Sequence, residues 1–338
     1  MDDRARRAAR RVGVLVGAVV LFAAGCSGGG DGGKGDGPPN IPHTPNIPHT
    51  PSTTSTQRTP NLPGKPSTPG SPGTPNTPGS PSSPSGPGTP GRAGPGAVRL
   101  PEPHMAFDYQ IGDPYGPPKG VRAVSRDRSA KPAPGLYNIC YVNAFQAQPD
   151  ATAWWQKNHP DLLLRKSGGA RAPLVIDQDW DEALLDVSTP AKRDRLARIV
   201  GEWIDGCAAS GFQAVEADNL DSHERSGGRL TLEHDLAFAR LLVDRAHAAG
   251  LAIGQKNAAE LAGRGRGVGF DFAIAEECGQ YEECDVYAKA FDNRVFDVEY
   301  EPAGLAAACR AYGGTLSIVL RDKDVRPAGE AAHRRRTC

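Results

Sequence analysis

The sequence predicts a (β/α)8 barrel, the TIM-barrel fold, preceded by a disordered linker rich in proline, glycine, serine and threonine. From about residue 105 onward, short apolar stretches alternate with helical ones, which is the pattern of repeated βα units. Eight such apolar stretches can be counted. The part of the chain that carries them, residues 99–338, has the length of one barrel of roughly 200 to 250 residues.

Residues 1–26 predict a lipoprotein-type signal peptide. Arginines crowd the first eleven residues, and Val12–Phe22 is an apolar run too short to span a membrane comfortably. The small residues Ala23-Ala24-Gly25 then precede Cys26, as in a bacterial lipobox. We therefore expect an extracellular protein, anchored to the outer face of the cell membrane through a lipidated Cys26. An ordinary signal peptide is the alternative, and the paired arginines also fit twin-arginine export.

Residues 27–98 predict a disordered spacer. The hexapeptide Asn40–Pro45 is repeated at Asn46–Pro51, and units of Thr-Pro-Gly and Ser-Pro-Gly follow. Such a segment has too little apolar surface to offset its ordering entropy, and its prolines keep it extended. The whole chain has 39 Lys and Arg against 39 Asp and Glu, so a formal net charge of zero argues against nucleic acid as a partner.

Six cysteines remain once Cys26 is assigned to lipid, an even number that favours disulfides in an exported protein. Sequence alone does not fix their connectivity. Cys278 and Cys284 are the predicted pair, because they are close and lie in one expected loop. A zinc site is the alternative, although neither a second cysteine pair at zinc-finger spacing nor a His-x-x-x-His accompanies them.

The eight predicted barrel strands are short apolar segments between turn residues. They are Phe107–Gly112, Val121–Arg126, Tyr137–Asn143, Phe212–Asp218, Leu251–Asn257, Phe270–Glu276, Val295–Tyr300 and Thr315–Leu320. Helices are expected at Ala191–Ser210, Thr231–Ala249 and Pro302–Tyr312, the first two followed by glycine. Leu174–Asp177 is a possible further strand, placed outside the barrel because a long insert follows it.

Acidic residues gather where the predicted strands end, which is where barrel enzymes carry their active sites. Glu216 and Asp218 are two residues apart and share one face of a strand, with Glu216 the deeper of the two. Lys256, Glu276 and Glu299 close the following strands. Ion pairs account for some of these residues, but the cations nearby are too few for all of them. Paired carboxylates indicate glycosidic bond cleavage, with one protonating the leaving oxygen and the other attacking the anomeric carbon or activating a water. Aromatic candidates for sugar stacking are Trp154, Trp155, Trp180, Tyr281 and Tyr287.

Seven segments in order carry a family resemblance: Ile139–Asn143, Trp180–Val187, Gly211–Asn219, Gly254–Asn257, Phe270–Cys278, Tyr281–Asp285 and Val295–Tyr300. With these motifs the chain resembles the endo-α-1,4-polygalactosaminidase family, glycoside hydrolase family 114, over residues 105–322. The resemblance implies a (β/α)8 barrel that hydrolyses α-1,4-linked galactosamine polymers. A cationic polymer of this kind also suits acidic strand ends.

The family's catalytic aspartate and glutamate correspond to Asp218 and Glu276. Asp218 is expected as the nucleophile or charge-stabilising carboxylate, and Glu276 as the general acid/base. Residues expected to bind substrate or support the site are Asp108, Tyr141, Asp186, Glu216, Asn219, Lys256, Asn257, Tyr281 and Glu299.

The sequence departs from the family pattern at a few positions. Ala217, Ala275 and Glu277 replace a proline, an asparagine and a glutamine, and Phe107 and Tyr109 stand where tryptophan is expected. We expect the exact substrate, rather than the fold, to depend on these changes.

Neither a cofactor nor a metal is expected, and the partners expected are the polysaccharide and the membrane, with the protein a monomer. Two alternatives remain open: a non-catalytic lipoprotein that binds cell-wall glycan, and a hydrolase of another α-linked cell-wall glycan. Retention or inversion depends on the separation of the two carboxyl groups, which sequence does not give.

Overall fold

The computed structural model of the protein describes residues 97–167, 169 and 171–338. The predicted signal peptide with Cys26, and nearly all of the predicted linker, lie outside the described residues.

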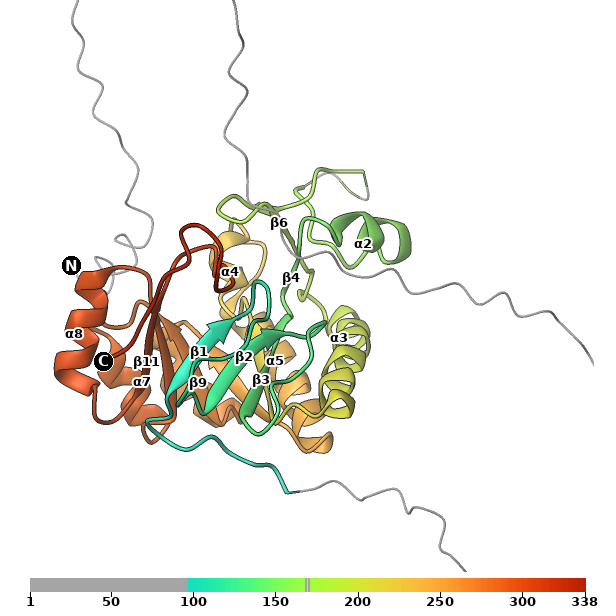
Figure 1. Ribbon diagram of the computed structural model, residues 1–338. Coiled ribbons are helices and arrows are strands. Elements are labelled where there is room, and N and C mark those ends of the chain that lie inside the picture. The colour runs from blue at the N-terminus through green and yellow to red at the C-terminus, as the bar shows by residue number, and fades with distance from the viewer. Residues whose placement is uncertain (1–96, 168, 170) are drawn as a thin grey trace, which may run out of the picture. The chain divides into compact units, whose positions relative to one another are not determined.

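Eight parallel strands form the curved sheet at the centre of the fold (Figure 1). Each overlaps one of the eight predicted stretches, so the predicted barrel is confirmed. In sheet order they are β1 (Phe107–Gln110), β2 (Ala123–Asp127), β3 (Tyr137–Asn143), β7 (Ala214–Asp218), β8 (Ala252–Lys256), β9 (Phe272–Glu276), β10 (Val295–Glu299) and β11 (Ser317–Arg321).

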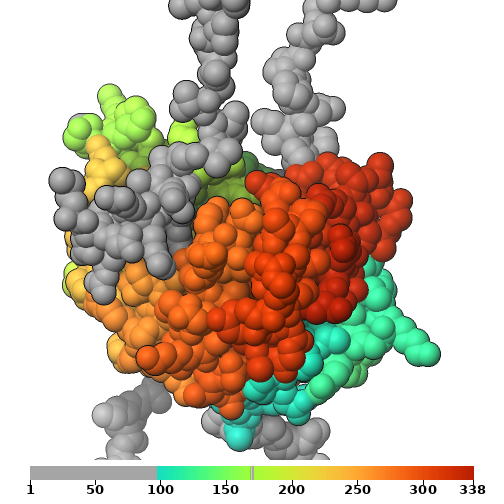
Figure 2. Space-filling model, turned by 90° about the vertical axis from the view of Figure 1, so that its left-hand side faces the viewer, coloured from blue at the N-terminus to red at the C-terminus, as the bar shows by residue number. Residues whose placement is uncertain are grey.

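The C-terminal segment links the last strand to the first. A short strand, β12 (Arg335–Arg336), pairs antiparallel with β11, and the guanidinium of Arg335 donates to the carbonyl of Phe107 in β1 at 3.0 Å. At the other end of the same seam, the backbone N–H of Met105 donates to Ser317 Oγ at 2.8 Å. On the face drawn in Figure 2, the red C-terminal residues accordingly lie beside the blue-green start of the described chain.

Helices cover the outside of the later strands. The three predicted helices are confirmed as α3 (Pro190–Ser210), α5 (Leu232–Ala248) and α8 (Pro302–Tyr312). Side-chain oxygens of Thr189 and Thr231 cap the first two, and Gly211 ends α3 with a φ of 93°. Shorter elements complete this half of the barrel: α4 (Ser222–Arg225), η1 (Ala259–Leu261), α6 (Ala262–Val268) and α7 (Cys284–Ala290).

The first two connections differ from a regular (β/α)8 barrel, because loops rather than helices follow β1 and β2 in the described chain. The segment after β1 contains Pro114, Pro117 and Pro118, and the segment after β2 contains Pro132 and Pro134. Proline removes a helical hydrogen bond and clashes with the preceding turn, so these short segments do not form helices.

A small excursion lies between β3 and α3, beyond the carboxyl ends of the barrel strands (Figure 1). Strands β4 (Gln146–Ala147), β6 (Glu182–Leu184) and β5 (Ile176–Asp177) form a three-stranded antiparallel sheet in that order, accompanied by α2 (Thr152–Asn158). The extra strand predicted at Leu174–Asp177 is therefore present, and it lies outside the barrel as expected.

Two apolar layers hold the barrel together. Alternate residues of the strands fill its interior, among them Phe107, Ile139, Phe272 and Phe296. The opposite faces of most strands pack against the helices in a larger cluster. Gly254 of β8 leaves the space that the Phe272 ring occupies, since a Cβ there would come within 2.7 Å of Phe272 Cε2.

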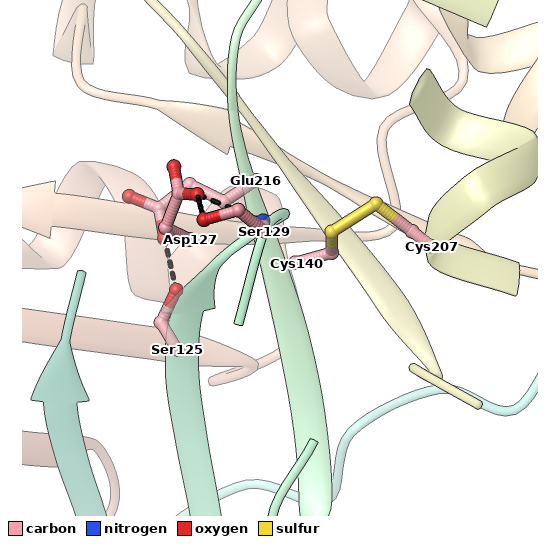
Figure 3. The surroundings of a disulfide bond; sticks show 6 residues. All are labelled: Ser125, Asp127, Ser129, Cys140, Cys207 and Glu216. Atoms are coloured by element: carbon pink, nitrogen blue, oxygen red, sulfur yellow. Dashed lines mark hydrogen bonds between the residues drawn. A yellow bond between two sulfur atoms is a disulfide. The ribbon is translucent and has the colours of Figure 1, made fainter. Parts of the chain in front are cut away.

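Three disulfides are present in the described residues. The predicted pair Cys278–Cys284 is confirmed, and Cys140–Cys207 and Cys309–Cys338 complete the set. Cys140 of β3 points outward to Cys207 of α3 (Figure 3). The zinc alternative is wrong, because the sulfurs of Cys278 and Cys284 are bonded to each other.

None of the helices in the described part of the chain is long and apolar enough to cross a membrane.

Candidate active site

Polar side chains meet inside the barrel at the carboxyl ends of neighbouring strands. Because side chains alternate along a strand, Glu216 and Asp218 of β7 face inward together, with Lys256 of β8 and Glu276 of β9 beside them. Glu216 is completely buried, whereas the Asp218 side chain is 15% exposed and that of Glu276 is 24% exposed. The predicted order of depth, Glu216 below Asp218, is therefore correct.

Lys256 lies at the centre of this group. Its Nζ is 3.0 Å from Asp218 Oδ1, 3.2 Å from Glu276 Oε2 and 3.4 Å from Glu216 Oε1. Three carboxylates thus share a single ammonium group. Burial alone lowers the pKa of Lys256, but the surrounding carboxylates outweigh it and raise that pKa well above its usual value. Lys256 is therefore positively charged at all physiological pH values.

Asp218 is held by donors at both of its oxygens. Oδ1 accepts from the backbone N–H of Asn219 at 2.8 Å as well as from Lys256, and Oδ2 accepts from the hydroxyl of Tyr141 at 2.8 Å. Asn219 and Tyr141, which were expected to bind substrate or support the site, thus lie in direct contact with Asp218.

Glu276 is fixed just as firmly. Its Oε2 accepts from Asn257 Nδ2 at 2.9 Å, while its backbone N–H donates to Asn257 Oδ1 at 2.8 Å. The hydroxyl of Tyr300, just after β10, donates to Oε1. Burial would raise the pKa of Glu276, but the Lys256 charge and the donors from Tyr300 and Asn257 outweigh it, so the pKa is lowered. Glu276 is a carboxylate in the free protein near neutral pH.

Glu216 forms the floor of the site. It accepts hydrogen bonds from Tyr109 at 2.7 Å and from Ser125 at 2.6 Å, the latter drawn in Figure 3. Burial raises the pKa of Glu216, Lys256 opposes the increase, and Asp218 adds to it. With no exposed surface, Glu216 supports Lys256 from below and has no direct access to a ligand.

The backbone turns sharply immediately after Asp218, Lys256 and Glu276. Asn219, Asn257 and Glu277 have φ values of 71°, 51° and 60°, in the left-handed region. Asparagine tolerates this region well, but a glutamate adopts it only when the surrounding structure requires it. These turns leave the side chains of Asp218, Lys256 and Glu276 at the strand ends while the chain leaves the barrel.

Three of the predicted site residues do not join this group. Asp108 is on the other face of β1 and pairs with Arg335 at 3.1 Å, which fixes the C-terminal segment. Asp186 pairs with Lys192 and accepts from Ser188 at the start of α3. Glu299 faces outward from β10 and accepts from the N–H of Gly279 at 2.6 Å, beside the equally buried Asp297.

The aromatic candidates divide by exposure. Trp155 and Tyr287 are buried in the core and offer no stacking surface. Trp154, Trp180 and Tyr281 are exposed.

Sequence reasoning missed Tyr300, Ser125 and Glu182 as members of the site. Tyr300 is the last residue of the predicted strand Val295–Tyr300, in which its neighbour Glu299 was the predicted site residue. Glu182 comes from the excursion sheet: Asn143 donates to its Oε2 at 2.8 Å and Asn219 donates to it at 3.4 Å.

The geometry suits two-carboxylate chemistry. Asp218 and Glu276 each have an oxygen close to the same Nζ, so these oxygens are no more than about 6 Å apart. Retaining glycosidases have about 5 to 5.5 Å between carboxyl groups and inverting ones about 6.5 to 9.5 Å. This upper limit applies to one oxygen of each carboxylate, and it is compatible with both classes.

Comparison with known proteins gives one family. The model of glycoside-hydrolase family GH114 matches residues 89–338. Among solved structures, Ega3 of Aspergillus fumigatus, crystallised with galactosamine, has 22% identity and a TM-score of 0.57, covering 72% of this chain and 98% of its own. The glycoside hydrolase domain of PelA from Pseudomonas aeruginosa has 16% identity and a TM-score of 0.46, covering 68% and 98%. No curated protein matches the chain.

Proposed function

The chain belongs to glycoside-hydrolase family GH114, and from that premise we propose that it cleaves α-1,4-linked galactosamine-containing polysaccharide with Asp218 and Glu276 as its catalytic carboxylates. The observation that supports this most strongly is the pairing of these two carboxylates on one lysine at the carboxyl end of the barrel. This is the position at which barrel enzymes carry their catalytic groups.

In the proposed reaction, Asp218 attacks the anomeric carbon while the glycosidic C–O bond breaks. Glu276 gives its proton to the departing sugar oxygen. In the second step Glu276 takes a proton from water, and that water replaces Asp218 at the anomeric carbon. The hydrogen bonds from Tyr141 and Asn219 orient the Asp218 carboxylate for attack.

The lowered pKa of Glu276 has a consequence for this scheme. The free enzyme holds Glu276 ionised, which suits its role as a base, but the first step requires its protonated form. We therefore expect activity to be highest on the acid side of neutrality and to fall as the pH rises.

The negative charge of the site supports the proposed substrate. Three carboxylates surround one lysine, and Glu182 adds a fourth acidic group beside Asp218, so the site has an excess of negative charge. A sugar with a free amine is cationic near neutral pH and fits such a site. The galactosamine bound to Ega3 is consistent with the same substrate class.

We also propose that the enzyme acts outside the cell, anchored to the outer face of the membrane by a lipidated Cys26. The three disulfides of the described residues support an oxidising compartment. Labelling with a radioactive or clickable fatty acid tests the anchor: the wild type should incorporate label and Cys26→Ala should not.

The activity is tested by incubating the full-length protein with partly de-N-acetylated α-1,4-galactosaminogalactan and measuring new reducing ends. Wild type should release them, whereas Asp218→Asn and Glu276→Gln should lose about two to four orders of magnitude in rate while melting like wild type. Glu233→Gln, an exposed acid of α5 paired with Arg264, is the matched control and should stay active. Binding of the polymer without cleavage would favour the glycan-binding alternative, and cleavage of a different α-linked glycan would favour the other hydrolase.

A further inference from the structure

We propose that Glu182 determines specificity by binding the 2-ammonium group of the galactosamine unit that lies against Asp218. This inference rests on the proposed function and extends it to one residue that selects the free amine over its N-acetylated form. Glu182 begins β6, in the excursion sheet beyond the strand ends, and therefore comes from outside the barrel.

The position of Glu182 is fixed by two amides that flank Asp218. Asn143 is paired with Asp218 in the β3–β7 ladder, and its Nδ2 donates to Glu182 Oε2 at 2.8 Å. Asn219, the residue after Asp218, donates to the same oxygen at 3.4 Å. Glu182 is thus held beside the proposed nucleophile by neighbours on both sides.

Glu182 has no salt-bridge partner of its own among the described residues. It is 8% exposed, and within the described residues it forms no ion pair with a lysine, arginine or histidine. The nearby Arg225 is engaged by Asp177 at 2.7 Å and by Asp221 at 2.8 Å. Among the residues that the structure describes, no hydrogen-bond donor reaches Glu182 Oε1. A carboxylate buried without a cation is costly, and a ligand ammonium would remove that cost.

The chemistry of the sugar places an amine in the right location. The 2-amino group is attached to the carbon next to the anomeric carbon, so when Asp218 faces the anomeric carbon, the nitrogen lies beside it. N-acetylation removes the positive charge and adds bulk at this point. An acid placed here therefore attracts the amine form and leaves the acetylated form with an unpaired buried carboxylate, which produces selectivity.

The test compares two substrates on the full-length protein: α-1,4-galactosamine oligosaccharides and the same oligosaccharides after chemical N-acetylation. For the amine form, we expect Glu182→Gln to lower kcat/KM roughly 30-fold, as for other buried charge pairs that lose one partner. For the acetylated form we expect a change of less than about threefold, since that form makes no ion pair with Glu182. Glu233→Gln changes the net charge equally at an exposed site and should leave both values unchanged.

An equal loss on both substrates, or an unaltered preference, would overturn the role of Glu182 while leaving the proposed function intact. Failure of the wild type to cleave either oligosaccharide would instead overturn the proposed function, and this inference with it.

A second measurement needs no variant. Burial raises the pKa of Glu182 to about 7, with Asn143 opposing it and Asp218 and Asp177 adding to it, while Arg225 lowers it. Between pH 5.5 and pH 7, the ratio of kcat/KM for amine over acetylated substrate should therefore rise about tenfold as Glu182 ionises. A ratio that stays constant over this range would contradict the proposal, because the catalytic carboxylates act on both substrates alike.

Discussion

Replacing Lys256 by methionine removes the cation shared by Glu216, Asp218 and Glu276, and the structure fixes how large the effect should be. The Lys256 side chain is 3% exposed, and its ammonium lies 3.0 to 3.4 Å from an oxygen of each acid. No other lysine, arginine or histidine of the described residues forms an ion pair with these three side chains. In Lys256→Met the site avoids an extra buried negative charge by taking up a proton.

The cost of that proton sets the magnitude. For a glutamate with an ordinary pKa of about 4.3, protonation costs about 4 kcal/mol at pH 7 and about 1 kcal/mol at pH 5. The value at pH 7 agrees with the roughly 3 to 5 kcal/mol that follows when one partner of a buried pair is removed. Any gain from packing the methionine is the same at both pH values. The difference of about 3 kcal/mol between them therefore isolates the charge.

Urea unfolding, followed by tryptophan fluorescence at pH 5 and at pH 7, measures both values. Lys157→Met, at an exposed position in the last turn of α2, is the control and should change stability by only a few tenths of a kcal/mol. A destabilisation by Lys256→Met that is equal at the two pH values would refute the reasoning, because it would mean that the lysine contributes packing rather than charge.

Three other predictions concern Tyr300, the buried acids of β10 and two of the disulfides. Tyr300→Phe removes a hydrogen-bond donor to ionised Glu276, so the pKa of Glu276 should rise. The basic limb of the pH profile of kcat/KM should then move up by about one pH unit. A limb that does not move would contradict the assignment of Glu276 as proton donor. Burial raises the pKa of Asp297 well above its usual value and that of Glu299 to about 7. Below their ordinary pKa values near 4, both acids are protonated in the folded and the unfolded protein, and stability is highest. As the pH rises to about 7, the unfolded protein ionises first and stability is lost. The double variant Asp297→Asn with Glu299→Gln should flatten that decline in the free energy of unfolding, and an unchanged slope would refute the prediction. Replacing both cysteines of Cys140–Cys207 by serine should cost about 4 kcal/mol and replacing those of Cys278–Cys284 about 2 kcal/mol, because the first bond spans 67 residues and the second spans 6; denaturant unfolding that reverses this order would contradict the chain-entropy estimate.

The sequence predicted the barrel and the meeting of its acidic strand ends because two regularities apply, whereas the proposed roles of Asp218 and Glu276 came from the family resemblance. Glu216 and Asp218 share one strand face by simple alternation, and barrel active sites lie at the carboxyl ends of strands. Asp218, Lys256 and Glu276 accordingly meet as expected.

At β1 and β10, the residue predicted to face the site is one position away from the residue that does so. Asp108 and Glu299 were predicted to face the site, but Tyr109 and Tyr300 do so instead. Both faces of these strands are buried, so their sequences lack the alternation of apolar and polar residues that would set the direction of each side chain.

The pattern of strands in the sequence did not predict the position of Glu182 or the loops after β1 and β2. Glu182 reaches the site from an excursion between β3 and α3, and its position depends on hydrogen bonds to Asn143 and Asn219. The absence of helices after β1 and β2 could have been anticipated from the prolines of those segments.

The most direct test of the central claim is the configuration of the first product, observed by proton NMR while the full-length enzyme cleaves an α-1,4-galactosamine oligosaccharide. If Asp218 attacks the anomeric carbon and Glu276 serves first as acid and then as base, the new reducing end should appear first as the α-anomer, and the β-anomer should grow in only by mutarotation. Initial release of the β-anomer would show a single displacement by water, and it would contradict the assignment of Asp218 as the nucleophile.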